Sequence, residues 1–357
     1  MRAAINSMST RRFSRPARYL GIAALLSIGA IGAIGATGLA LAAPAPTRLV
    51  ETVGANGSIG GLEAKFIDVE GVRTRYYDVG TGEVMLLVHG SGFDGTSSAN
   101  TWSLNIPGLS KRFRVIAADK LASGMTGNPA SDDDLSIAGE VQHMYNFVKA
   151  LQIKQIHLIG QSRGAGLAFL FAVAHPEMVK TLVLLDSATA SPPAGDDRNK
   201  RRDRLFAGCP EKETPQGDQF RCEQSALYYD ASPVSDGFVS SAAYMWNQPK
   251  AQETRKRMTA AVRKRNETIS SEMTQRAYHR ILTEDVLQMP TLIYWGKNDP
   301  SVLPEQGYAL YNIIAESNPR AWMLFTNRGG HFHYREHPQE FNTNVINFVT
   351  SWGGSGH

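Results

Sequence analysis

The chain has 357 residues, of which 42% are hydrophobic and 20% are charged, the composition of a globular protein with enough apolar side chains for a core. Residues 1–42 contain five arginines and no acidic residue, so the formal net charge of +4 becomes −1 for the remainder. This near-neutral balance argues against a nucleic-acid partner and against an anionic-membrane partner.

The first 42 residues have the pattern of an export signal. A basic stretch at residues 11–18 precedes an apolar run at residues 19–43, and Ala-Leu-Ala at residues 40–42 fits a small-x-small cleavage site. We therefore predict that residues 1–42 are removed, and that the mature protein is periplasmic or secreted without a stable membrane partner. The apolar run is long enough to span a bilayer, so an uncleaved membrane anchor is the alternative.

The chain has two cysteines, Cys209 and Cys222. In an exported protein, two nearby cysteines predict one disulfide that closes a short loop. Neither belongs to a pattern typical of catalysis or zinc binding, and the sequence implies no metal and no cofactor.

The next part of the chain alternates between strand and helix patterns. Residues 43–61 are rich in Gly and Pro and predict a flexible lead-in, and residues 64–77 have a hairpin pattern. Residues 137–151 have helical periodicity. Short apolar runs, typical of strands buried on both faces of a parallel sheet, stand before and after this helix, at residues 84–88, 115–118, 156–159 and 182–185. Strands that alternate with helices predict an α/β fold with a mostly parallel, doubly wound sheet.

The pattern changes at residues 191–285, which have many charges of both signs and no strongly apolar strand. We predict a mainly helical cap there. Strand patterns return at residues 291–295 and 321–325, and an amphipathic helix is predicted at residues 338–352. The domain organisation is therefore a core in two parts, residues 62–190 and 286–357, with the cap inserted between them.

A Gly-x-Ser-x-Gly motif stands at residues 160–164, between the apolar run 156–159 and a helix-forming stretch at residues 165–172. Strand, tight turn and helix are the context of a nucleophile elbow, in which a strained backbone lifts the serine hydroxyl clear of the sheet. The sequence therefore predicts Ser162 as a nucleophile.

A serine hydroxyl is a poor nucleophile at neutral pH and needs a base that is oriented by a carboxylate. Asp299 and His331 each follow a late strand, in the chain order that this fold requires. We predict that His331 takes the Ser162 proton and that Asp299 orients His331. Asp186 and Asp119 are the alternative acids.

Two other histidines occur near these motifs. His333 is two residues from His331 but lacks the preceding pair of glycines, and His89 is expected to brace the loop that follows its strand. This Gly-rich loop, residues 89–92, is predicted to supply the backbone N–H of Ser91 to an oxyanion hole. The second oxyanion donor is predicted to be the backbone N–H of Arg163, the residue after the nucleophile.

These motifs occur in the order and spacing of the α/β-hydrolase fold family, which the chain resembles over about residues 62–190 and 286–353. They are His-Gly-Ser-Gly, Asp-Lys-Leu-Ala-Ser-Gly, Gly-Gln-Ser-Arg-Gly, Gly-Lys-Asn-Asp and Gly-His-Phe, at residues 89–92, 119–124, 160–164, 296–299 and 330–332. Within the family, residues 100–119 and 330–338 are similar to the meta-cleavage product hydrolases. The resemblance implies an α/β-hydrolase fold and, for that subfamily, cleavage of carbon–carbon bonds in aromatic breakdown.

Our main functional prediction is an exported serine hydrolase that cleaves a small or medium carboxylic ester through an acyl-enzyme. We expect an ester because the substrates of meta-cleavage product hydrolases arise inside cells. The alternative is carbon–carbon hydrolysis of the meta-cleavage product type, with Arg201, Arg202 or Arg204 as candidates to hold a substrate carboxylate. A second alternative, a non-catalytic binding protein on the same fold, is disfavoured because the three catalytic positions and the Gly-rich loop are all present. The oligomeric state is left open.

Overall fold

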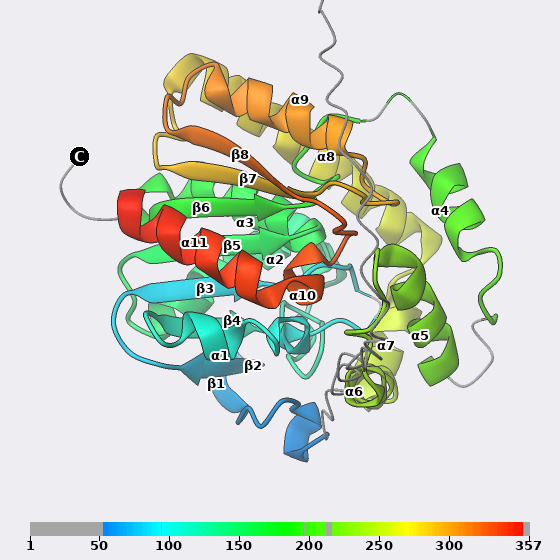
Figure 1. Ribbon diagram of the computed structural model, residues 1–357. Coiled ribbons are helices and arrows are strands. Elements are labelled where there is room, and N and C mark those ends of the chain that lie inside the picture. The colour runs from blue at the N-terminus through cyan, green and yellow to red at the C-terminus, as the bar shows by residue number, and fades with distance from the viewer. Residues whose placement is uncertain (1–52, 94, 194, 196, 212–215, 353–357) are drawn as a thin grey trace, which may run out of the picture. The chain divides into compact units, whose positions relative to one another are not determined.

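The computed structural model describes residues 53–93, 95–193, 195, 197–211 and 216–352 (Figure 1). The predicted signal at residues 1–42, and residues 43–52 of the predicted lead-in, lie outside these described residues. Within the described ranges, no helix combines the length and the apolar character needed to cross a membrane.

The core of the fold is an eight-stranded sheet with the strand order β1-β2-β4-β3-β5-β6-β7-β8. Only β2 runs antiparallel to its neighbours β1 and β4, and every pair from β4 to β8 is parallel. The strands are β1 (Lys65–Val69), β2 (Val72–Val79), β3 (Val84–Val88), β4 (Arg114–Ala118), β5 (Ile156–Gln161), β6 (Val179–Leu185), β7 (Thr291–Gly296) and β8 (Ala321–Thr326). Because the parallel strands are covered on both faces, β5 and β7 are buried along their whole length.

Helices cover the two faces of the sheet, and each face has its own apolar cluster (Figure 1). One cluster joins the sheet to α2, α3, α8 and α9, and the other joins it to α1 and α11. The helices of the core are α1 (Ile106–Leu109), α2 (Ile137–Ala150), α3 (Arg163–Ala174), α9 (Pro304–Ala315), α10 (His333–Glu336) and α11 (Pro338–Trp352).

The segment between β6 and β7 is helical and forms the cap. Its helices are α4 (Arg198–Phe206), α5 (Gln216–Leu227), α6 (Asp236–Trp246), α7 (Pro249–Arg257) and α8 (Ala260–Glu284). Helices α4 to α7 stand at one end of the sheet, on the right in Figure 1. Phe220, Phe238 and their apolar neighbours form a separate small cluster there, so the cap has its own packing.

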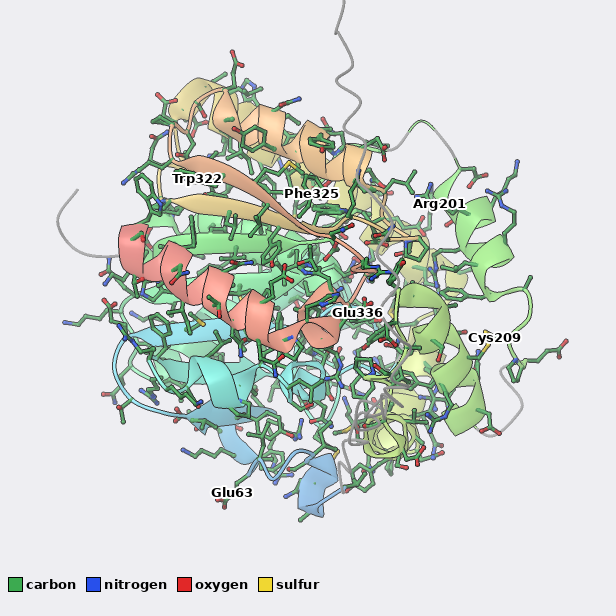
Figure 2. All side chains as sticks on the ribbon, viewed as in Figure 1. Glu63, Arg201, Cys209, Trp322, Phe325 and Glu336 are labelled. Carbon is green, nitrogen blue, oxygen red and sulfur yellow. A yellow bond between two sulfur atoms is a disulfide. The ribbon has the colours of Figure 1, made fainter. Side chains whose placement is uncertain are left out.

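The predicted disulfide between Cys209 and Cys222 is present and links the segment after α4 to α5. Figure 2 shows Cys209 at the outer edge of the cap, away from the sheet. The predicted fold class is confirmed, since the chain has a mostly parallel α/β sheet with a mainly helical insertion.

Candidate active site

The turn between β5 and α3 has the geometry of a nucleophile elbow. Ser162 has φ 55° and ψ −125°, a backbone conformation that L-residues rarely adopt. Small neighbours make this close turn possible, because a Cβ on Gly160 would lie 2.4 Å from the carbonyl oxygen of Gly164. A Cβ on Gly164 would lie 2.3 Å from the carbonyl oxygen of His89. The two glycines of the motif therefore allow strand, helix and the neighbouring loop to approach closely.

The predicted base and acid are in direct contact. The distance between His331 Nδ1 and Asp299 Oδ2 is 2.7 Å, and both side chains are almost fully buried. The other carboxylate oxygen, Oδ1, accepts hydrogen bonds from Ser301 N at 2.8 Å, Ser301 Oγ at 3.1 Å and Val302 N at 2.9 Å. Because these three donors hold Oδ1, the carboxylate has one orientation, and Oδ2 is left for the imidazole.

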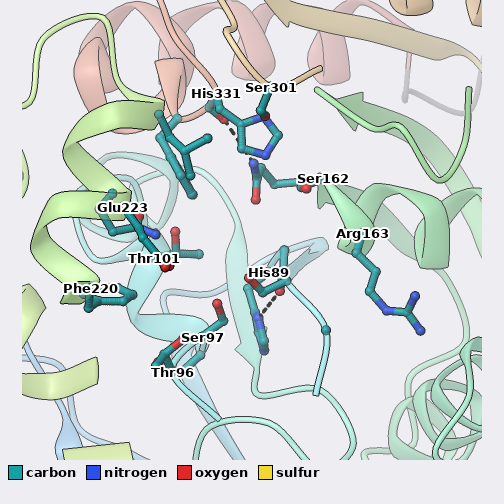
Figure 3. Close-up of a pocket in the computed structure, with 18 of the residues that line it drawn as sticks. His89, Thr96, Ser97, Thr101, Ser162, Arg163, Phe220, Glu223, Ser301 and His331 are labelled. Atoms are coloured by element: carbon teal, nitrogen blue, oxygen red, sulfur yellow. Dashed lines mark hydrogen bonds between the residues drawn. The ribbon is translucent and has the colours of Figure 1, made fainter. Parts of the chain in front are cut away.

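The loop of His331 is fastened to the elbow and to the cap. Gln161 Nε2 donates to the carbonyl oxygen of His331 at 3.1 Å, which holds the residue before the nucleophile against the histidine loop. In Figure 3 the imidazole of His331 lies over Ser162 in the same pocket. On the cap side, Glu336 accepts from the backbone N–H groups of Gly330 and Tyr229 at 2.8 and 3.0 Å. Glu336 lies in the stretch 330–338 that carries the resemblance, but sequence reasoning gave it no role.

Asp119, one of the alternative acids, is engaged elsewhere. It forms a fully buried ion pair with Arg75 at 3.0 Å. It also accepts from the backbone N–H groups of Ala99 at 2.7 Å and Met125 at 2.8 Å. Through these contacts Asp119 holds together the loops that follow β3 and β4.

Asp186, the other alternative acid, lies with His333 in a second buried pair. Asp186 Oδ1 accepts from the backbone N–H of Gly296 at 2.8 Å, and His333 Nε2 lies 3.0 Å from Asp186 Oδ2 without the alignment of a hydrogen bond. Burial, reinforced by the nearby charge of Asp299, raises the pKa of Asp186 well above its usual range. Burial lowers the pKa of His333 to about 4. Burial therefore favours the neutral form of each group.

The Gly-rich loop after β3 lines the same pocket as Ser162. Ser91 has φ +59°, in the left-handed region. His89 Nδ1 lies 2.9 Å from the carbonyl oxygen of Gly90, and His89 Nε2 accepts from the backbone N–H of Lys120 at 3.1 Å. Burial, followed by the charge of Lys120, lowers the pKa of His89 well below its usual range, so the ring is neutral and its Nδ1–H donates. His89 braces the loop, as expected.

A cavity of about 310 Å³ lies between the sheet and the cap (Figure 3). Ser162, His331 and the Gly-rich loop line its floor, and Phe206, Phe220 and Phe238 of the cap line its walls. Of the three cap arginines considered from the sequence, Arg202 lines this cavity, whereas Arg201 donates to the carbonyl oxygen of Ser301 at 3.0 Å. The aromatic wall had no sequence signal, because the cap contains no motif that fixes its packing.

Arg163 follows Ser162 directly, and its side chain turns away from the nucleophile (Figure 3). It forms an ion pair with the buried Glu140 at 2.9 Å. Neither Glu140 nor this contact was expected from the sequence. The described residues contain no group of three or more His, Cys, Asp and Glu side chains that could hold a metal ion.

Comparison with known proteins agrees with this geometry. A family model described as alpha/beta hydrolase fold matches residues 83–338. The chain is 32% identical over 294 residues to a 2-hydroxymuconate semialdehyde hydrolase of Pseudomonas putida, which covers 78% of this chain and 91% of that relative. It is 28% identical over 287 residues to the 2-hydroxy-6-oxo-6-(2'-aminophenyl)hexa-2,4-dienoic acid hydrolase of Metapseudomonas resinovorans, covering 80% of this chain and 90% of that relative.

The solved structures give a similar result. A mutant of the meta-cleavage product hydrolase CumD from Pseudomonas fluorescens is 30% identical, with a TM-score of 0.65. The match covers 80% of this chain and 98% of that structure, so it includes both the core and the cap.

These relatives correct the main functional prediction. A carboxylic ester was expected as the substrate, but the relatives that match along most of their length are meta-cleavage product hydrolases, the stated alternative. The physical reason for the error is that a serine, an imidazole and an oxyanion hole attack esters and activated ketones alike. The motifs therefore did not separate the two substrate classes, and the packing of the cap over the cavity was not derivable from the sequence.

Proposed function

We propose that this chain, a hydrolase that belongs to the alpha/beta hydrolase fold family, cleaves a carbon–carbon bond next to the aldehyde or ketone carbonyl of a carboxylate-bearing substrate of the meta-cleavage product type. The observation that carries the proposal is the likeness to meta-cleavage product hydrolases, which extends over 91% of the length of a relative that is 32% identical. A small-molecule substrate agrees with a cavity of about 310 Å³.

The contacts of the site support a sequence of steps. With the substrate in its keto form, Ser162 Oγ adds to the aldehyde or ketone carbon while His331 Nε2 takes the hydroxyl proton. Asp299, 2.7 Å from Nδ1, stabilises the imidazolium that forms. The new oxyanion is expected to accept from the backbone N–H groups of Ser91 and Arg163.

Collapse of this intermediate breaks the carbon–carbon bond. The electron pair passes to the leaving carbon and is delocalised into the neighbouring unsaturated keto acid, which takes a proton from His331. Water, deprotonated by His331, then attacks the acyl group on Ser162 and releases the second carboxylic acid. The reaction is a hydrolysis overall, because one water is consumed and no electrons are exchanged with another molecule.

Arg202 is the cap residue proposed to hold the substrate carboxylate. It lines the cavity, and its guanidinium carbon lies 5.6 Å from the centre of the Phe206 ring on the same helix. A hydrogen bond between charged groups contributes about 1.5–3 kcal/mol, so Arg202→Gln should raise KM about 10- to 100-fold. Arg204→Gln is the matched control, since Arg204 is exposed on the same helix and is not among the residues that line the cavity.

The activity is tested with the full-length mature protein and 2-hydroxymuconate semialdehyde, whose visible absorbance disappears on cleavage. We expect turnover that is lost in Ser162→Ala, and two carboxylic acid products by mass spectrometry. The proposal would be contradicted if the parent protein reacts with a fluorophosphonate but cleaves neither this substrate nor its 6-aryl and 6-alkyl analogues.

We also propose that the chain is exported and cleaved after Ala42, which requires that its substrate be available outside the cytoplasm. The disulfide between Cys209 and Cys222 supports this proposal, because disulfides persist in oxidising compartments. Mass spectrometry of the protein recovered from cell fractions measures the N-terminus. A mature chain that begins at residue 43 in the periplasm or medium is expected, and an intact N-terminus in the membrane fraction would indicate the anchored alternative.

A further inference from the structure

Three charged side chains beside the elbow form a connected chain of ion pairs. Lys120 Nζ lies 3.1 Å from Glu140 Oε1, and Arg163 Nη2 lies 2.9 Å from Glu140 Oε2. The side chains of Lys120 and Glu140 are 3% and 0% exposed, and that of Arg163 is 18% exposed. We propose that this Lys120–Glu140–Arg163 chain is a positioning device that aims both amides of the oxyanion hole. The inference rests on the proposed roles of Ser162 and of these amides.

Lys120 acts on one side of the oxyanion hole, because it holds two successive peptide planes of the Gly-rich loop. A trans peptide is planar, so fixing a carbonyl oxygen aims the N–H of the next residue in the opposite direction. The backbone N–H of Lys120 holds His89 at 3.1 Å, and His89 in turn holds the carbonyl oxygen of Gly90 at 2.9 Å. This contact aims the N–H of Ser91.

The side chain of Lys120 holds the next peptide plane. Lys120 Nζ donates to the carbonyl oxygen of Ser91 at 2.6 Å, which fixes the peptide between Ser91 and Gly92. Ser91 has φ +59°, where a non-glycine residue is strained by about 1 kcal/mol or more. The loop therefore needs an outside contact to keep this conformation, and the charged amine of Lys120 supplies it.

Arg163 acts on the other side of the oxyanion hole. Its Nε and Nη2 both donate to Glu140 Oε2, at 3.1 and 2.9 Å, so the guanidinium is held by two bonds. Its Nη2 also lies 3.3 Å from Asn266 Oδ1 on the cap helix α8, and Asn266 Oδ1 accepts from the backbone N–H of Ile137 at 3.2 Å. The first residue of α3 is thereby held by its side chain, and its backbone N–H is the second donor proposed for the oxyanion hole.

Glu140 is the residue that joins these two sides. It lies in the first turn of α2, where its two carboxylate oxygens contact Lys120 and Arg163 separately. The two proposed donors come from the loop after β3 and the turn after β5, which also touch directly, since the guanidinium carbon of Arg163 lies 5.4 Å from the centre of the Phe93 ring. Glu140 adds a charged link between the two residues that hold these donors, so its effect should appear in the rate of attack rather than in substrate binding.

The test uses Glu140→Gln, which keeps the shape of the side chain and removes its charge. The readout is the second-order rate of Ser162 labelling by a fluorophosphonate, whose reaction passes through the same oxyanion and does not depend on the natural substrate. Removal of one oxyanion donor costs about 10²–10³ in rate, so a hole with displaced donors should label about 10- to 100-fold more slowly. Arg163→Met should also be slowed, and Arg163→Lys should recover part of the rate.

Asp78→Asn is the matched control. It removes the ion pair with Arg114 at 2.9 Å, which lies on β2 and β4, away from the residues that line the cavity. Its labelling rate should equal that of the parent even if its thermal stability falls. Folding of each variant is checked by circular dichroism, and Arg163→Met is decisive if Glu140→Gln does not fold.

The labelling experiment distinguishes failure of this inference from failure of the proposed function. Folded variants of Glu140 and Arg163 that label as fast as the parent would overturn it and reduce the ion-pair chain to a structural role. A parent protein that does not label at all would instead contradict the proposed role of Ser162. For turnover of 2-hydroxymuconate semialdehyde, we expect kcat to fall in Glu140→Gln while KM stays within about threefold, whereas a loosened cap would raise KM.

Discussion

Asp299→Asn is the substitution whose outcome the structure determines most closely. Asp299 Oδ1 accepts from Ser301 N, Ser301 Oγ and Val302 N, so this position must remain an oxygen in the variant. The new NH2 group is then forced into the position of Oδ2, 2.7 Å from His331 Nδ1. Two donors cannot face each other there, so His331 must carry its proton on Nε2.

A histidine protonated on Nε2 cannot take the proton of Ser162. In a serine protease triad the same exchange lowers kcat about 10⁴-fold, which corresponds to about 5.4 kcal/mol of transition-state stabilisation. We expect a loss of this size because the geometry forces the same tautomer. The assays are the rate of fluorophosphonate labelling and the turnover of 2-hydroxymuconate semialdehyde.

Asp186→Asn is the matched control for this prediction. Burial raises the pKa of Asp186 and so favours its neutral carboxyl form, which an amide resembles in shape and charge. We expect its labelling rate to stay within about threefold of the parent. An Asp299→Asn protein that keeps a tenth or more of the parent rate, together with an inactive Asp186→Asn protein, would refute the reasoning and make Asp186 the acid.

Three further predictions concern stability and pH. Replacing Cys209 and Cys222 by alanine opens a disulfide that joins residues 13 apart and should cost about 3 kcal/mol of unfolding free energy; an unchanged urea midpoint would contradict this. Asp119→Asn leaves the buried Arg75 without its counter-charge and should cost about 3–5 kcal/mol in the same assay, whereas a loss below about 1 kcal/mol would deny that the ion pair matters. Burial lowers the pKa of His143 and of His333 to about 4, below the value near 6.5 of the unfolded chain, so the unfolded state binds more protons as the pH falls below 6.5. Each of these two histidines should therefore lower the free energy of unfolding by about 2 kcal/mol between pH 7.5 and pH 5. His143→Gln should reduce this pH dependence. If the free energy of unfolding falls equally with pH in parent and variant, His143 does not contribute to the loss.

The sequence by itself determined the parts of this protein that depend on local pattern. Apolar runs of strand length identify the parallel strands, because such strands are buried on both faces and tolerate few polar residues. The glycines around Ser162 identify the elbow, because only small residues fit where strand and helix meet. Asp299 and His331 were predicted as acid and base from their places after late strands, because parallel strands bring the loops at their carboxyl ends to one edge of the sheet.

The tertiary structure decided everything that depends on which distant residues meet. Chain order left Asp119, Asp186 and Asp299 as possible acids, and only the folded geometry shows that Asp299 reaches His331 Nδ1. The same holds for Arg163, whose partner Glu140 is 23 residues earlier in the chain and carries no motif. The cap was the least predictable part, because its helices pack through scattered aromatic residues such as Phe220 and Phe238. Packing of this kind sets the shape of the cavity and leaves no periodic trace in the sequence, so the sequence could not choose between an ester and a carbon–carbon bond, and the ester was the wrong choice.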